Sequence, residues 1–219
     1  MPKITSVESQ KKNPKRFNVF LDGQFGFGAN EDLVVEHRLI TGKILTSEQV
    51  DKLLFEAEVG KLMERVMGLI NIRARSEKEI RDYLRTLSFK RKVKQKEEIS
   101  DIAIDLLINK LKQKRLISDE DFARAWVESR QKNKKKGKVA IKQELYQKGI
   151  AKEIIEEIME KTSQDSEEVL AEQAILKRIR LWEKLENLEF KKKALEYLLR
   201  KGFEYEVAKT VVENYLKKR

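Results

Sequence analysis

Two stretches of this chain repeat one arrangement of apolar residues around a glycine. The first runs from Ile141 to Met159 and the second from Ala194 to Val212. Because glycine readily takes the positive φ that ends a helix, each stretch predicts two short helices joined at the glycine. The corresponding residues lie 53 positions apart: Ile141, Leu145, Gly149, Ile150, Ile154, Ile158 and Met159 match Ala194, Leu198, Gly202, Phe203, Val207, Val211 and Val212.

A looser copy begins at Ile80 and Leu84, which lie 61 residues before Ile141 and Leu145. Each helix pair follows a further amphipathic helix, and one helix pair cannot bury its apolar face alone. We therefore predict a mainly α fold, in which three tandem three-helix repeats form an elongated curved body. The predicted divisions are an N-terminal element at 1–58 and repeats at 59–117, 118–164 and 165–219.

The first thirty residues show the periodicity of strands. Phe17 to Leu21 alternates in the manner of a strand, and Asp22-Gly23 is typical of a type I′ hairpin turn. The returning strand is expected to place Phe25 and Phe27 on one face. Because two or three strands are marginal alone, we predict a small N-terminal β-hairpin element, with three strands, packed against a helix.

Helix signals are strong after this element. Thr46 and Gln49 form a capping-box pair that opens a long helix directed toward Arg75, with Gly60 as a candidate break between the N-terminal element and the first repeat. The next helix is predicted over 77–87. The basic segment from Lys90 to Lys96 is expected to interrupt the helical pattern.

Composition excludes several classes of protein. The sequence has 40% apolar and 39% charged residues but only 2 prolines, as expected for a helical chain. It contains no cysteine, so disulfides and thiolate metal sites are excluded. The N-terminus lacks the apolar segment of a signal peptide, and no run approaches the roughly 18 apolar residues of a membrane span. We expect a cytoplasmic monomer with no membrane partner.

No constellation of catalytic residues is apparent. His37 is the single histidine, so it is interpreted as a structural or surface residue and not as a base or metal ligand. Gly23, Gly26 and Gly28 could suggest a phosphate loop, but the alternating strand pattern around them favours a hairpin. We predict that the chain is not an enzyme, with no catalytic residues, no cofactor and no metal.

The charge of the chain points to an anionic partner. The formal net charge is +11, and nearly all of the excess falls on residues 61–160. A field of this sign attracts nucleic acid or an acidic protein groove, although a solubilising surface is the alternative. The candidate binding residues are Arg81, Arg85, Lys90, Arg91, Lys92, Lys94, Lys96, Arg124, Arg130, Lys134, Lys135, Lys136, Lys138 and Lys142.

Each of these candidates also has a structural interpretation. The lysines around Gly137 could hold phosphate beside a helix start or could lie on a solvated loop. Arg130 could contact a ligand or form an intramolecular strut to Asp119 or Glu144. Trp126 lies within an apolar stripe, so core packing is favoured over base stacking.

The stretch from Leu116 to Ile150 resembles the regulatory protein RecX family. The three-helix unit in triplicate agrees with that family, and the resemblance covers about residues 60–219. The leading β segment is similar to extensions of some members. The residues that carry the match are Asp119, Phe122, Ala123, Arg130, Gly137, Ile141, Glu144, Leu145, Lys148, Gly149 and Ile150.

This resemblance implies a non-enzymatic regulator of the RecA recombinase. Such a protein binds RecA and its single-stranded DNA filament along the filament groove and inhibits ATPase, strand exchange and SOS co-protease activity. It would act in homologous recombination and DNA repair, with direct weak DNA binding as an additional expectation. The alternatives are a helix-turn-helix-like nucleic-acid-binding module that acts independently of RecA, and a helical protein scaffold.

Overall fold

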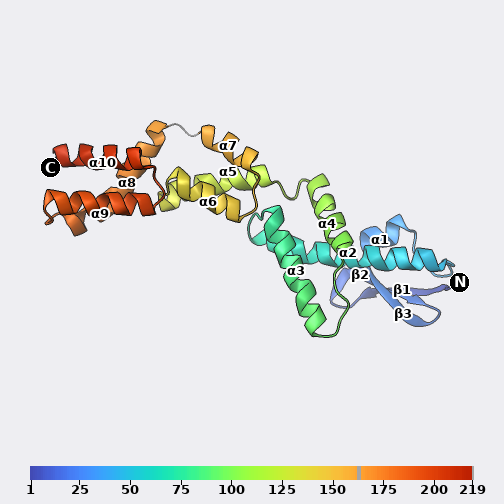
Figure 1. Ribbon diagram of the computed structural model, residues 1–219. Helices are drawn as coiled ribbons and strands as arrows, with labels where there is room; N and C mark the ends of the chain where they lie inside the picture. Colours follow the sequence, from blue (N-terminus) through green and yellow to red (C-terminus); the bar gives the residue numbers. More distant parts are fainter. Residues whose placement is uncertain (162–163, 219) are drawn as a thin grey trace. The chain divides into compact units, whose positions relative to one another are not determined.

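A computed structural model of the chain describes residues 1–161 and 164–218. The N-terminal element is a three-stranded antiparallel sheet in the order β1-β2-β3, as predicted (Figure 1). Asp22 (φ 49°) and Gly23 (φ 82°) form the turn between the second and third strands. The strands are β1 (Ile4–Gln10), β2 (Asn13–Leu21) and β3 (Gln24–Asn30).

The third strand contains a bulge that separates its two phenylalanines. Val19 pairs with Phe27, whereas the next residue, Phe20, pairs with Phe25, so Gly26 has no partner across the strands. An extra residue of this kind shifts the alternation of side chains by one. Phe27 is consequently buried at 4% exposure, whereas Phe25 is 60% exposed. The prediction that both rings share a face is therefore wrong.

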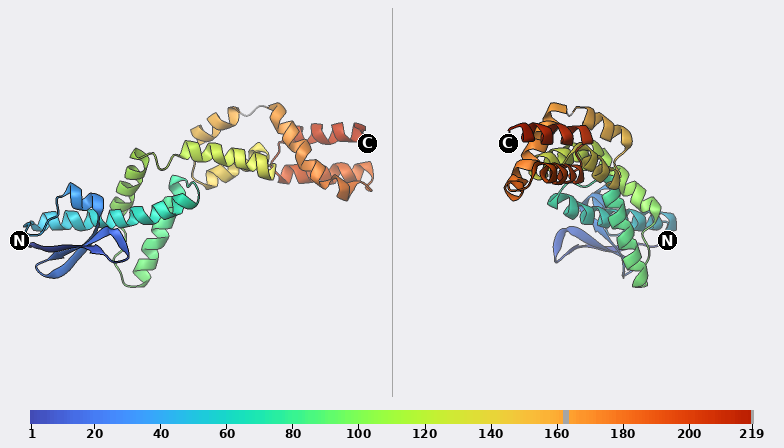
Figure 2. Two further views of the ribbon diagram at one scale, coloured as in Figure 1. Left: turned by 180° about the vertical axis from the view of Figure 1, so that it is seen from behind. Right: turned by 60° about the vertical axis from the view of Figure 1, so that its left-hand side comes forward.

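One face of the sheet packs against two helices, α1 (Glu31–Glu36) and α2 (Ser47–Ile72) (Figure 2). The predicted capping box is present at the start of α2, where Gln49 N–H donates to Thr46 Oγ1 at 3.2 Å and Gln49 Oε1 accepts from Thr46 N–H. The sheet and the two helices share a core that consists of Ile4, Val19, Phe27, Ala29, Leu33, Leu39, Leu45, Leu53 and Ala57.

The helix α2 continues without interruption past Gly60, so the candidate break at that residue is not a break in the helix. Residues on both sides of the position are buried, including Val59 at 1% and Leu62 at 0% exposure. The proposed division between 58 and 59 therefore falls inside a single helix.

The chain forms two compact units, one of residues 1–74 with 80–116 and one of residues 75–79 with 117–219. The first unit also contains α4 (Asp101–Gln113) and most of α3 (Glu77–Val93). Because α3 extends to Val93, Lys90 lies within its last turn, and the basic segment from Lys90 to Lys96 interrupts the helix only after Val93. The helix ends in a turn where Gln95 has φ 53° and the N–H of Lys96 donates to Arg91 O at 3.0 Å.

The second unit contains the two regular repeats. Gly149 (φ 78°) and Gly202 (φ 86°) end the second helix of each, as predicted. The repeats have separate cores, one around Ile141 and Leu145 and the other around Leu198. The first of these two repeats comprises α5 (Asp119–Ser129), a π-helical turn η1 (Arg130–Lys134), α6 (Lys138–Gln147) and α7 (Lys152–Glu160). The second comprises α8 (Gln164–Trp182), α9 (Asn187–Arg200) and α10 (Tyr205–Lys218).

The second unit, which includes residues 75–79 at the start of α3, contains a recurring junction between helix ends and helix starts. The carbonyl of Lys148, at the end of α6, accepts a hydrogen bond from Ser76 Oγ at 2.8 Å, directly before α3 begins. The carbonyl of Lys201, at the end of α9, accepts one from Gly137 N–H at 3.1 Å, directly before α6 begins. The end of the second helix in one repeat therefore docks on the start of the second helix in the repeat before it.

An acidic side chain completes each junction. Asp119 accepts a hydrogen bond from Glu77 N–H at 2.8 Å, and Glu167 accepts one from Lys138 N–H at 2.9 Å. Glu77 and Lys138 are the first residues of α3 and α6, whose N–H groups lack a partner inside the helix. The first helix of each later repeat thus caps the second helix of the repeat before it.

The architecture confirms the predicted mainly α fold with a small N-terminal sheet. Over the residues that the structure describes, no helix is sufficiently long and apolar to cross a bilayer. The four-part division into 1–58, 59–117, 118–164 and 165–219 stays a prediction, and its boundary between 164 and 165 adjoins residues 162–163, which are outside the described part of the chain.

Candidate nucleic-acid interface

Half of the fourteen candidate cations are engaged by acidic side chains. An ion pair of this kind compensates the charge of the cation and reduces its attraction for an external anion. The pairs are Arg81–Asp105 (2.6 Å), Arg91–Glu58 (2.5 Å), Lys92–Glu98 (2.9 Å), Arg130–Glu144 (2.6 Å), Lys138–Glu167 (3.6 Å), Arg124–Glu120 and Lys136–Glu144.

The other half have no acidic partner among the residues that the structure describes. In the first unit, three of these lysines lie at the end of α3 and in the turn that follows it. In the second unit, two lie where η1 turns toward α6. Uncompensated charges of this kind dominate attraction to a polyanion. The seven residues are Arg85, Lys90, Lys94, Lys96, Lys134, Lys135 and Lys142.

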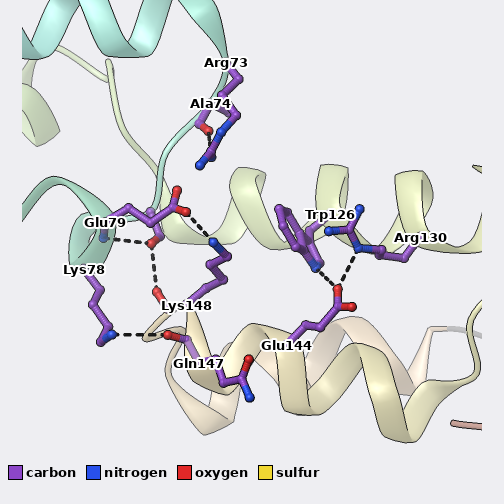
Figure 3. A network of polar contacts seen from close by, with 10 residues as sticks. Arg73, Ala74, Lys78, Glu79, Trp126, Arg130, Glu144, Gln147 and Lys148 are labelled. Atoms are coloured by element: carbon purple, nitrogen blue, oxygen red, sulfur yellow. Dashed lines mark hydrogen bonds and ion pairs between the residues drawn. The ribbon is translucent and has the colours of Figure 1, made fainter. Parts of the chain in front are cut away.

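In the second unit, two of the candidates, Arg130 and Lys136, converge on the carboxylate of Glu144, which extends from α6. Its Oε2 accepts hydrogen bonds from Trp126 Nε1 at 2.7 Å and from Arg130 Nε at 2.6 Å (Figure 3). Its Oε1 accepts one from Lys136 Nζ. The left-handed φ of Lys135 (49°) turns the chain so that Lys136 N–H also donates to Arg130 O at 3.3 Å. The π-helical turn therefore brings both cations to one carboxylate.

Arg130 is held by stacking as well as by its hydrogen bond. Its guanidinium carbon lies 3.9 Å from the centre of the Trp126 ring, whose other contacts include a stacked Phe122 at 5.5 Å. Of the two intramolecular ion pairs predicted for Arg130, the one with Glu144 is present. Asp119 instead accepts a hydrogen bond from the N–H of Glu77 at the start of α3. The prediction of core packing holds for Trp126 in part, because the ring is half-buried and also supports a cation.

The electrostatic environment of Glu144 is set by opposing effects. Burial would raise the pKa of this carboxyl, but hydrogen bonds from Lys136, Arg130 and Trp126 outweigh burial and lower the pKa below its ordinary value. The ionised form is therefore favoured in the folded chain. The network contributes stability above the ordinary pKa of glutamate and loses that contribution as the pH falls through the lowered pKa.

We expect this acid transition to be visible in Trp126 fluorescence. In a Trp182→Phe chain, Trp126 is the only tryptophan, and protonation of Glu144 releases the two cations that surround it. The emission should change in a step centred below the ordinary glutamate pKa of about 4.3. A further Glu144→Gln substitution should remove this step. A midpoint at or above the ordinary value, or a step that persists after the Glu144→Gln substitution, would contradict this description of the network.

Two neighbours of this network were absent from the sequence-based candidates. Lys148 Nζ pairs with Glu79 Oε1 at 2.5 Å and lies 5.2 Å from the centre of the Trp126 ring (Figure 3). Lys201 occupies the corresponding position before Gly202, so the repeat spacing could have identified Lys148 as a junction residue. Glu79 belongs to a different helix, and nothing in its local sequence predicts this contact.

The single histidine of the chain contacts an acidic side chain. His37 Nε2 lies 2.5 Å from Glu56 Oε2 in the first unit, as a structural contact. Among the side chains of residues 1–161 and 167–218, no group of three or more His, Cys, Asp and Glu is arranged to hold a metal ion.

Comparison with known families gives matches along most of the chain. Residues 2–46 match the model described as the regulatory protein RecX N-terminal domain. Residues 118–159 and 166–212 match those described as the second and third three-helix domains of RecX.

Known proteins and structures agree with these matches. Proteins named regulatory protein RecX are 32% identical over 207 residues in Listeria monocytogenes (94% of this chain, 73% of that protein) and 32% identical over 213 residues in Bacillus subtilis (97% and 77%). A crystal structure of a regulatory protein RecX is similar with a TM-score of 0.75 at 24% identity, covering 97% of this chain and 100% of that one. A RecX structure from Lactobacillus salivarius has a TM-score of 0.61 at 24% identity, covering 71% and 95%.

Proposed function

Because the chain belongs to the RecX family of regulatory proteins, we propose that it regulates the RecA recombinase by binding RecA and its filament on single-stranded DNA. The supporting observation is the match to proteins named regulatory protein RecX over 94% of the chain. The proposed effect is inhibition of the ATPase, strand-exchange and co-protease activities of RecA, without catalysis by the chain itself. Its place of action is the cytoplasm, where RecA meets DNA.

The distribution of charge is consistent with this proposal. Lys134 and Lys135 in the second unit, and Lys90, Lys94 and Lys96 in the first, lack acidic partners among the described residues. A nucleoprotein filament presents DNA phosphates, which such lysines attract in a manner that salt weakens.

The test is a titration of RecA ATPase activity on single-stranded DNA with the full chain. Hydrolysis should fall as the protein is added, and the concentration for half inhibition should rise with salt. Unchanged hydrolysis at several-fold excess over RecA would reject an inhibitory role. A matched titration with heat-denatured protein controls for sequestration of DNA by an unfolded basic chain.

A helix-turn-helix-like activity independent of RecA finds less support. In the second repeat, α7 (Lys152–Glu160) would occupy the position of a recognition helix, and it carries four glutamates against one lysine. Such a helix would be repelled by phosphates in a DNA groove. Sequence-specific retention of duplex DNA in a gel shift would favour this alternative.

A further inference from the structure

We propose that Arg130 binds one phosphate group of single-stranded DNA end-on, through its Nη1 and Nη2 atoms, with Glu144 and Trp126 as its positioning residues. This inference deepens the proposed function, because it assigns a ligand group to a particular side chain. Both interpretations of Arg130 then apply, because its ion pair with Glu144 orients the Nη1 and Nη2 atoms that bind the ligand.

The contacts of the guanidinium leave one edge available. Of the Arg130 nitrogens, Nε is the one that donates to Glu144 Oε2, at 2.6 Å, and the other carboxylate oxygen accepts from Lys136. Trp126 covers one flat face of the group at 3.9 Å. Among the described residues, neither Nη1 nor Nη2 has a partner, and the Arg130 side chain is 25% exposed. Figure 3 shows the terminal nitrogens directed away from Glu144.

A guanidinium in this state suits a phosphate. Its two parallel N–H donors match two phosphate oxygens, which a lysine ammonium cannot reproduce. Arginine normally loses side-chain freedom when it binds, but here the ring and the carboxylate have already fixed its orientation. Pre-organisation of this kind increases affinity because less entropy is lost on binding.

The surroundings favour a DNA phosphate over an isolated carboxylate of a protein. Lys134 and Lys135 follow Arg130 in the same turn and have no acidic partner among the described residues. The N–H of Lys136 donates to Arg130 O, so the backbone of this turn closes on the residue that carries the guanidinium. Several adjacent positive charges fit a ligand that carries a series of phosphates.

The experiment measures binding of the full chain to a fluorescent oligo(dT) of about 20 nucleotides by anisotropy, at several salt concentrations and without RecA. Arg130→Lys keeps the charge and removes the paired donors, so we expect affinity to fall by about tenfold with an unchanged salt slope. The matched control is Arg180→Lys on α8, whose arginine is exposed and is not one of the candidate binding residues. It should bind within about twofold of the unsubstituted chain.

Two charge-conserving variants test the positioning residues. Glu144→Asp withdraws the carboxylate by one methylene, and Trp126→Leu removes the ring beneath the guanidinium. Each should weaken binding with the salt slope unchanged, while Trp126→Phe, which keeps a ring, should recover part of the loss. Melting temperatures show whether each variant is folded. If Trp126→Leu does not fold, the DNA affinity of Glu144→Asp alone tests whether positioning of Arg130 matters.

Equal oligo(dT) affinity for the unsubstituted chain and Arg130→Lys would overturn the inference. It would also be overturned if Arg130→Lys weakened binding to DNA-free RecA alone, because the ligand would then be a protein group. A RecA ATPase titration distinguishes failure of the proposed function from failure of this inference. Absence of inhibition by the unsubstituted chain rejects the proposed function, whatever the DNA affinities, whereas inhibition combined with unchanged DNA binding in Arg130→Lys rejects only this inference.

Discussion

Replacing Gly202 by Ala is expected to lower the free energy of unfolding of the second unit by about 2–5 kcal/mol. Gly202 has φ +86°, where a side chain is strained. A Cβ there would lie 2.2 Å from Ala140 Cβ and 2.4 Å from Ala140 N. The start of α6 must therefore move, and the junction to the preceding repeat loosens. Calorimetry or urea unfolding followed by circular dichroism measures the loss.

The matched control is Gly42→Ala in the first unit. Gly42 has φ +96°, but nothing lies within 4 Å of an added Cβ. This substitution should cost only the conformational strain, about 1–2 kcal/mol, in the unit that contains it. A loss for Gly202→Ala no greater than that for Gly42→Ala would show that close approach at the junction contributes nothing.

Neutralising Lys134 and Lys135 together should weaken RecA inhibition without loss of fold. We expect Lys134→Gln with Lys135→Asn to reduce the salt slope of single-stranded DNA binding by about 1.4, because each contact to a single strand contributes about 0.7. Asparagine tolerates the positive φ of Lys135. The readouts are oligo(dT) anisotropy across a salt series and the concentration that half-inhibits RecA ATPase.

The design avoids the two neighbouring lysines. Lys136 and Lys138 pair with Glu144 and Glu167, and removing them would leave partly buried carboxylates uncompensated. The control removes the same number of charges from exposed positions in the third repeat, as Lys184→Gln with Lys192→Gln. If both double variants lost affinity equally, the effect would come from net charge and not from the turn after η1.

Local signals predicted a large part of the fold. Gly149 and Gly202 end helices because few other residues adopt a positive φ, and the apolar residues around them fix which helix faces are buried. Asp22-Gly23 specified its hairpin for the same reason. These features depend on residues close in sequence, so the sequence is sufficient to predict them.

Features that depend on distant residues were predicted less well. The bulge at Gly26 exposes Phe25 because of the register with β2, which the alternating pattern of β3 does not contain. The last turn of α3 was missed because lysines and arginines give no apolar periodicity. For the candidate interface, the basic residues were identifiable, but their division into paired and unpaired sets requires the positions of Glu58, Glu144 and Glu167 in space.

The turn after α3 has a consequence for what the end of that helix can contact. It has the hydrogen-bond pattern found at the ends of α6 and α9, yet its left-handed residue is Gln95 and not glycine. At Gly202 a Cβ would lie 2.2 Å from the helix start on which that turn docks. A side chain at this position is incompatible with an approach as close as that of Gly202 to Ala140. The end of α3 therefore lacks the glycine surface with which α9 contacts a neighbouring helix start.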